Sequence, residues 1–251
     1  MKFNRGHFQF AFQTEKDTPA AAPLYYLRLL QGTSIGPDRE VQVKRTAESG
    51  RASDGIAVVG AMGSGGTVNF VCQPESLGAV LYGALGDVAS AGGTAPYTHE
   101  LTPEQAGSLP WITGFVQIDT INMLIPNLKI NSLKLVVSSA DRLVVGQMEL
   151  MGAGAVQYKT AAPSPSVTPE AVAKKFAWDM AKDAWVLDGA TVGYIHTFES
   201  NINNNLTAIP GEDYFPYDVQ EGPLDVDYAA VISIIDASQY NTLVWGSATP
   251  S

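Results

Sequence analysis

Few side chains in this chain of 251 residues can carry acid–base or metal chemistry, since it has three histidines and one cysteine. His7, His99 and His196 lie in separate segments, and no two of them have the i, i+4 spacing of a helical metal site. Cys72 lies on the apolar face of an expected strand, so we expect a buried small hydrophobic side chain and no thiolate nucleophile. The spacing therefore predicts no catalytic residue, no cofactor and no metal site.

Residues 60–66 (GAMGSGG) raise the question of phosphate binding because of their glycines. A phosphate cradle has its glycines after a strand and at the start of a helix, followed by a lysine. Here the glycines precede an expected strand and no lysine follows. We therefore predict a flexible hairpin turn at residues 60–66.

Carboxylates crowd one proline-containing stretch of the chain: Glu212, Asp213, Asp218, Glu221, Asp225 and Asp227. The stretch lacks the spacing of a calcium-binding loop. Three prolines within it favour an extended, exposed connection, so we expect these charges to be solvated. A carboxylate pair for glycoside cleavage stays open, because the separation that matters there is spatial.

The elements that would hold these residues are mostly strands, because segments with a two-residue hydrophobic period dominate. We expect strands over residues 67–72, 111–124, 131–139, 142–151, 176–180, 184–187, 191–203 and 228–235. Residues 131–139 and 142–151 predict a hairpin that turns at 139–141. The pattern indicates a mainly β, antiparallel protein.

Two short helices are expected beside these strands. The first covers residues 74–85, where proline suits the first turn and Leu77, Val80 and Leu81 share one apolar face. The second covers residues 236–247, with Leu243 and Val244 on its apolar face. We expect both apolar faces to pack against a sheet.

The two strand-and-helix units suggest an internal repeat, since a shift of 163 residues superimposes their apolar positions. On this interpretation residues 1–160 hold an N-terminal arm and a first half, and residues 170–251 form a second, shorter half that packs on the first. The Pro/Ser-rich residues 161–169 would be the junction. A long surface loop within one domain is the alternative.

Charge is distributed unevenly along the chain, whose formal net charge is −10. Residues 1–51 carry eight Lys or Arg and five Asp or Glu, whereas residues 183–251 carry ten carboxylates and no Lys or Arg. This separation suits head-to-tail self-association or a lumen of one sign, and an ordinary acidic surface is the alternative. It disfavours a nucleic-acid-binding surface, which needs clustered cations. No apolar run is long enough for a membrane span, residues 1–10 do not read as a secretory signal, and one cysteine excludes an internal disulfide framework.

The order of several motifs resembles the major tail tube proteins of long-tailed (siphovirus-type) bacteriophages. The motifs are the strand at 66–70 leading into the helix at 74–85, Tyr97-Thr98-His99 before the turn at 109–111, the hairpin strand 131–137, and residues 186–192 followed by 203–206. The likeness spans about residues 8–245. It rests on the order of elements and on loose motifs.

The resemblance implies a structural, non-enzymatic virion protein with a tail-tube β-sandwich or barrel and short flanking helices. Such subunits form homo-oligomeric rings that stack into a tube, contact other tail proteins and let viral DNA pass without specific binding. One tube domain per chain implies six subunits per ring, whereas a full duplication would allow three. The protein would be made in the host cytoplasm and reside in the virion tail, without membrane contact.

Residues 32–55, rich in Gly, Ser and charges, are expected to form a loop that contacts the next ring. Its cations Arg39, Lys44, Arg45 and Arg51 are the candidate inter-ring contacts. The main alternative is an extracellular or virion β-sandwich binding module, such as a carbohydrate-binding, capsid or baseplate component. A carbohydrate binder should expose an aromatic platform on one strand face, whereas the four tryptophans here fall in separate elements.

Overall fold

The computed structural model describes residues 6–45, 55–92, 98–105, 107–118, 120–138, 142–163, 167–171, 175–176, 185–187, 190–212 and 214–233. In chain order the elements are β1 (Gly6–Phe12), β2 (Tyr25–Leu27), β3 (Ser34–Arg45), β4 (Gly55–Val71), α1 (Pro74–Leu85), β5 (Gly86–Ala91), β6 (Thr98–Pro103), β7 (Ile112–Ile118), β8 (Ile121–Ser138), β9 (Val144–Gly152), β10 (Gln157–Lys159), β11 (Trp185–Leu187), β12 (Ala190–Asn203), β13 (Thr207–Ile209), β14 (Asp218–Gln220) and β15 (Asp225–Ser233). The mainly β, antiparallel fold class is confirmed. The second expected helix, with Leu243 and Val244, lies outside the described residues.

One sheet curls on itself to form the centre of the molecule. Its strands follow the order β2-β1-β7-β8-β9-β4-β3, and Leu29, just beyond β2, forms an isolated bridge with Phe70 of β4. Two backbone hydrogen bonds flank that bridge, from Leu30 N to Asn69 O and from Val71 N to Arg28 O. The sheet is thereby closed into a barrel-like sandwich, and closure covers edges that would otherwise be free.

The interior of this barrel is filled by large apolar side chains. Phe8, Phe10, Leu27, Phe70, Ile125, Leu128, Ile130, Leu133 and Met148 have 2% or less of their surface exposed. On β8 both Ile125 and Leu128 point into the barrel although they are three residues apart. In a regular strand side chains alternate between the two faces, so residues three apart would lie on opposite faces. The left-handed φ of 54° at Asn127 and a register shift against β7 supply the extra residue.

Helix α1 packs on the barrel as its apolar spacing predicts. Proline stands in its first turn and Gly86, with φ of 94°, ends it in the left-handed conformation. Val80 is fully buried in the core, and Leu77 and Leu81 are partly buried against it. Asn204 joins the helix to the sheet, because its Nδ2 donates to Ala84 O at 3.0 Å and to Ile130 O at 2.9 Å.

Residues 167–171 and 175–176 lie on the outside of the barrel beside its seam. Arg28 Nη2 donates to Glu170 O at 3.1 Å, and the Glu170 carboxylate accepts the Glu75 N–H in the first turn of α1 at 3.2 Å. Phe176 N donates to Cys72 O, and Val144 N donates to Phe176 O. A segment distant in sequence therefore fastens α1, β4 and β9 together.

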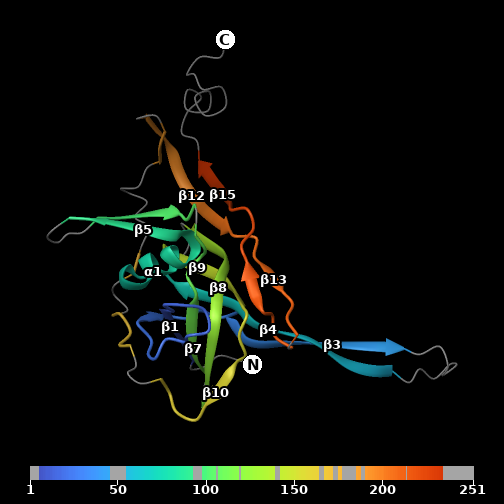
Figure 1. Ribbon diagram of the computed structural model, residues 1–251. Helices are drawn as coiled ribbons and strands as arrows, with labels where there is room; N and C mark the ends of the chain where they lie inside the picture. Colours follow the sequence, from blue (N-terminus) through green and yellow to red (C-terminus); the bar gives the residue numbers. More distant parts are fainter. Residues whose placement is uncertain are drawn as a thin grey trace.

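Three pairs of strands extend away from the barrel (Figure 1). The longest is the ribbon of β3 with the first part of β4, paired from Ser34↔Thr67 out to Arg45↔Gly55. The second pair is β5 with β6, which forms a separate two-stranded sheet. The third pair is β12 with β15, and it continues the main sheet because β12 also pairs with β8. The molecule is thus a compact barrel with strand pairs that project from it.

Several sequence expectations need correction. Residues 60–66 are an interior part of β4, and most of residues 32–55, expected as a loop, belong to the β3–β4 ribbon. The single strand expected at residues 111–124 is instead β7, which ends at Ile118, and the beginning of β8, which starts at Ile121 and pairs antiparallel with β7. Part of the expected N-terminal arm is β1, a barrel strand paired with β7. The predicted hairpin at 131–151 is confirmed, since β8 pairs with β9 from Leu128↔Gly152 to Val137↔Val144.

Candidate assembly surface

The three histidines lie on separate elements. His7 on β1 stacks against Tyr26 with ring centroids 5.7 Å apart, and burial lowers its pKa. His99 on β6 contacts the Ser90 hydroxyl at 2.8 Å, and His196 on β12 contacts that of Ser233. Within the described part of the chain no three His, Cys, Asp or Glu side chains cluster in a way that could hold a metal ion.

Cys72 and the glycine-rich stretch serve the fold. Cys72 is fully buried, and burial raises the pKa of its thiol to about 12. Gly65 and Gly66 have φ of 140° and 129°, and a Cβ on either would lie 2.1 Å from a backbone oxygen, of Leu150 and Ser34 respectively. The glycines let β3, β4 and β9 approach closely in the sheet, and the predicted hairpin turn at residues 60–66 is wrong.

The acidic stretch is only partly solvated, because two of its carboxylates bind lysines of the same chain. Lys129, on the outer face of β8, has a side chain only 3% exposed, and its Nζ lies 2.5 Å from Glu221 and 4.0 Å from the centroid of the Trp111 ring. Nζ also donates to Val219 O at 3.1 Å, and Glu221 in turn accepts the Leu109 N–H at 3.0 Å. This ammonium cluster fastens β14 and Glu221, which follows it, to the barrel wall.

A second ammonium is held in the same manner at the rim. Lys16 Nζ donates to Tyr217 O at 2.6 Å, lies 3.3 Å from Asp218 and sits 4.2 Å from the centroid of the Tyr217 ring. Trp111 lies between the two lysines and is partly covered by them. It therefore offers no open aromatic platform for a sugar.

The sequence did not point to Lys129, because nothing in a single lysine within an apolar run identifies its partner 92 residues away. The signal that the sequence did offer was a lysine within the mostly apolar residues 123–130 (MLIPNLKI). In the structure this lysine lies in a run of six buried positions of β8, where a charged side chain needs a partner.

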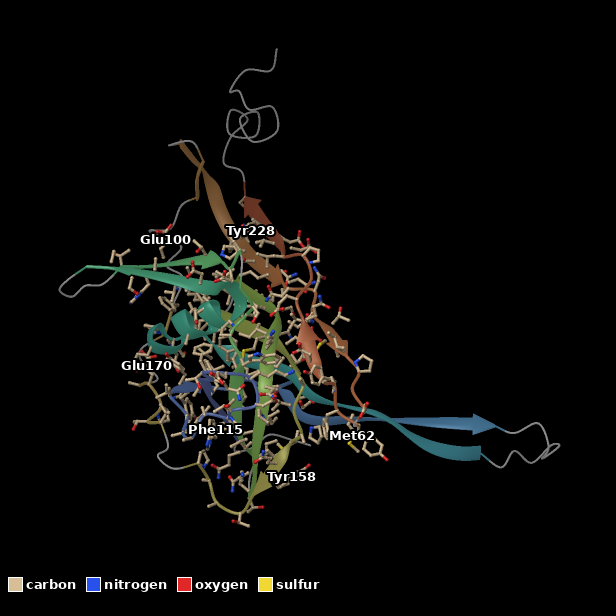
Figure 2. All side chains as sticks on the ribbon, viewed as in Figure 1. Met62, Glu100, Phe115, Tyr158, Glu170 and Tyr228 are labelled. Atoms are coloured by element: carbon tan, nitrogen blue, oxygen red, sulfur yellow. The ribbon has the colours of Figure 1, made fainter. Side chains whose placement is uncertain are left out.

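The candidate inter-ring cations belong to the projecting ribbon. Arg39, Lys44 and Arg45 are residues of β3, with Arg39 opposite Met62 and Arg45 opposite Gly55. Arg51 lies outside the described residues. At the ribbon's base, Met62 N donates to Tyr214 O at 2.7 Å, so the acidic stretch sits where the ribbon leaves the barrel (Figure 2).

The least covered strand is β15, which we call the edge strand. Among the described strands it pairs only with β12. Tyr228 is 69% exposed and Val231 60% exposed, and these two residues lie on opposite faces of the strand because they are three positions apart. Tyr228 also stacks on Phe198 of β12, with centroids 6.1 Å apart. Both faces and one edge of β15 are thus open to a partner within the described part of the chain.

Comparison with known proteins points to one family. The family model described as phage tail tube protein matches residues 4–248. No curated protein matches the chain. In the part that the structure describes, no helix is long and apolar enough to cross a membrane.

Proposed function

Since the chain belongs to the phage tail tube protein family and is a structural protein of the virion tail, we propose that it forms closed rings that stack into the conduit for viral DNA. Membership of the family implies a non-enzymatic protein that self-assembles and contacts other tail proteins. The proposal adds the ring, its stacking and the passage of DNA.

The observation that carries this proposal is the edge strand. A monomer rarely leaves an apolar strand uncovered on its edge and on both faces, because such a strand pairs with any other free edge. In a closed ring, the sheet of one copy would continue into the next, and every copy would cover its neighbour's edge strand. Ring closure accounts for exposed apolar residues that an isolated subunit would not tolerate well.

The test compares two matched tyrosine substitutions. Tyr228→Lys places a charge in the edge strand, whereas Tyr158→Lys places the same charge at a similarly exposed tyrosine on β10, 65% exposed. We expect rings by electron microscopy and sedimentation for wild type and Tyr158→Lys, and monomers for Tyr228→Lys. Monomeric wild-type protein over a wide concentration range would refute ring formation.

Six copies per ring follow if each chain supplies one tube domain. Arg39, Lys44, Arg45 and Arg51 are proposed to lie at the contact between rings, with the ribbon reaching beyond its own ring. Mass measurement of the ring tests the copy number.

DNA is proposed to slide through the tube without specific binding. A net charge of −10, and no Lys or Arg after Lys182, leave little counterion release to drive affinity for phosphates. We expect no mobility shift of duplex DNA at submicromolar protein and physiological salt. A shift under those conditions would overturn this part of the proposal.

We also propose that residues 1–160 and 170–251 are two units joined at residues 161–169. The pairing of β12 with β8 supports packing of the second unit on the first. Limited proteolysis should cut first within residues 161–169 and leave both fragments associated. A first cut elsewhere, or separation of the fragments, would contradict this division.

A further inference from the structure

The seam of the barrel, where Leu29 forms its isolated bridge with Phe70, is a short join. One backbone hydrogen bond lies on each side of the bridge, and the Thr33 hydroxyl adds bonds to Leu30 O at 3.0 Å and from Asn69 N at 3.1 Å. By contrast, β4 pairs with β9 without interruption along the whole inner part of β4. Opening the seam therefore breaks fewer strand contacts than opening the β4–β9 join.

A strap of residues 167–171 and 175–176 lies across this seam on the outside of the barrel. On one side, the Gln9 side chain of β1 accepts the first N–H of the strap at 3.3 Å. On the other side, the Gln73 side chain, just after β4, donates to Ala171 O at 3.3 Å. Both glutamines are buried, with 0% and 1% of their surface exposed. The strap is thus attached to fixed groups on both sides of the seam.

Glu170 is the central contact of the strap. Arg28, at the seam itself, donates from Nη2 to Glu170 O at 3.1 Å. The Glu170 carboxylate accepts the Glu75 N–H at 3.2 Å, in the first turn of α1, whose N-cap residue Gln73 makes no side-chain cap hydrogen bond. Figure 2 shows Glu170 on the outer side of the molecule beside α1. One residue therefore ties the β2 side of the seam to the helix on the other side.

The strap is held more loosely than the strands beneath it. Its four hydrogen bonds given above are 3.1–3.3 Å long, longer than the usual value of about 2.9–3.0 Å for N–H···O bonds. Thr168, Pro169 and Ala171 are exposed, and Phe176 keeps 40% of its surface exposed. Segments with few buried apolar contacts and exposed hydrogen bonds open at free energies well below that of global unfolding.

We propose that the strap is a reversible latch, whose release lets the seam open while the rest of the barrel stays folded. The two events are coupled because the strap joins both sides of the seam through Gln9, Arg28, Gln73 and Glu75. An open seam presents unpaired backbone groups, which pair readily with another chain. The latch therefore keeps the barrel of a free subunit from joining other copies through its seam.

Amide hydrogen exchange tests the latch in the full chain, at a concentration where sedimentation shows monomer. Glu170→Ala removes the carboxylate contact and Arg28→Met removes the guanidinium contact, so each should raise exchange at the seam amides of Leu30 and Val71 about threefold to tenfold. The amides of the β8–β9 pairing should keep their wild-type rates. Thr168→Ala, at an exposed strap residue whose side chain makes none of these contacts, is the matched control and should exchange as wild type.

Exchange of the wild-type protein in low urea gives a second readout that needs no variant to fold. The strap amides of Val167 and Phe176 should exchange at least as fast as those of Leu30 and Val71, and all four faster than the β8–β9 amides. The latch is overturned if the wild-type seam amides exchange only together with the β8–β9 pairing. It is overturned as well if both variants leave the seam amides unchanged, or raise all amides by one factor, as a uniform loss of stability would. These outcomes do not depend on ring formation.

Discussion

The Lys129 cluster offers a quantitative test, because three groups converge on one buried ammonium. Replacing Lys129 by Met keeps most of the side-chain volume, but among the described residues it leaves the Glu221 carboxylate with the Leu109 N–H as its one remaining partner. Breaking one side of a buried ion pair costs about 3–5 kcal/mol. The Glu221 side chain is 29% exposed, which lets water compensate part of that cost. We therefore expect Lys129→Met to lower the free energy of unfolding by about 2–4 kcal/mol.

A matched control lies on the same strand. Lys134 on β8 pairs with Glu199 at 2.7 Å, but both side chains are more than a third exposed, at 39% and 37%. Lys134→Met should therefore cost less than about 1 kcal/mol. The two variants differ in the burial of the pair and share the substitution.

The assay is urea unfolding followed by tryptophan fluorescence, at a concentration where sedimentation shows monomer. The double variant Lys129→Met/Glu221→Gln should be more stable than the sum of its single variants predicts, by about 2 kcal/mol, because it leaves no unpaired charge. Equal costs for Lys129→Met and Lys134→Met would refute the argument. Strict additivity of the Lys129 and Glu221 changes would refute it as well.

Three further predictions follow from backbone conformation and burial. Gly66→Ala should lower the free energy of unfolding, measured by thermal unfolding, by at least about 2 kcal/mol, because the new Cβ would clash with Ser34 O. Gly78→Ala is the control, since a Cβ there meets nothing within 4 Å, and it should leave the free energy of unfolding unchanged or raise it by about 0.5–1 kcal/mol. Cys72, with a thiol pKa of about 12, should resist iodoacetamide at pH 8 in the folded protein and react in urea, and rapid native labelling would contradict its burial. Burial lowers the pKa of His7 in the folded protein. As the pH falls below about 6.5, the usual pKa of histidine, the unfolded chain therefore takes up a proton before the folded protein does, and the free energy of unfolding decreases. Urea unfolding at pH values from 7.5 to 5 should show a smaller decrease for His7→Gln than for wild type.

The sequence predicted elements whose signals are local. Helix α1 has a proline at its start, a glycine at its end and an apolar face between them, and its observed bounds match the expected ones. The hairpin strands β8 and β9 have alternating apolar residues in the sequence on both sides of residues 139–141. In both cases neighbouring residues determine the element.

The predictions were wrong where a residue pattern typical of one local element serves a contact with distant strands. The glycines of residues 60–66 have the composition of a turn, yet Gly65 and Gly66 are needed because two other strands approach β4 closely. Residues 119 and 120 of the sequence are neither glycine nor proline, so β7 and the beginning of β8 were expected as one strand. The Lys129 cluster could not be predicted either, because Trp111, Lys129 and residues 219–221 come from three distant segments.

The position of β15 in the chain has a consequence for synthesis in the infected cell. About 65 residues separate β10 from β15, so a ribosome that adds roughly 5–20 residues per second delivers the edge strand about 3–13 s after the barrel strands. Because β15 pairs with β12, and β12 with β8, the edge strand can be placed only on a barrel that already exists. Nascent chains on one polysome thus acquire the edge strand after the barrel strands, and if this strand makes the proposed contact between subunits, the order of translation limits premature joining of unfinished subunits.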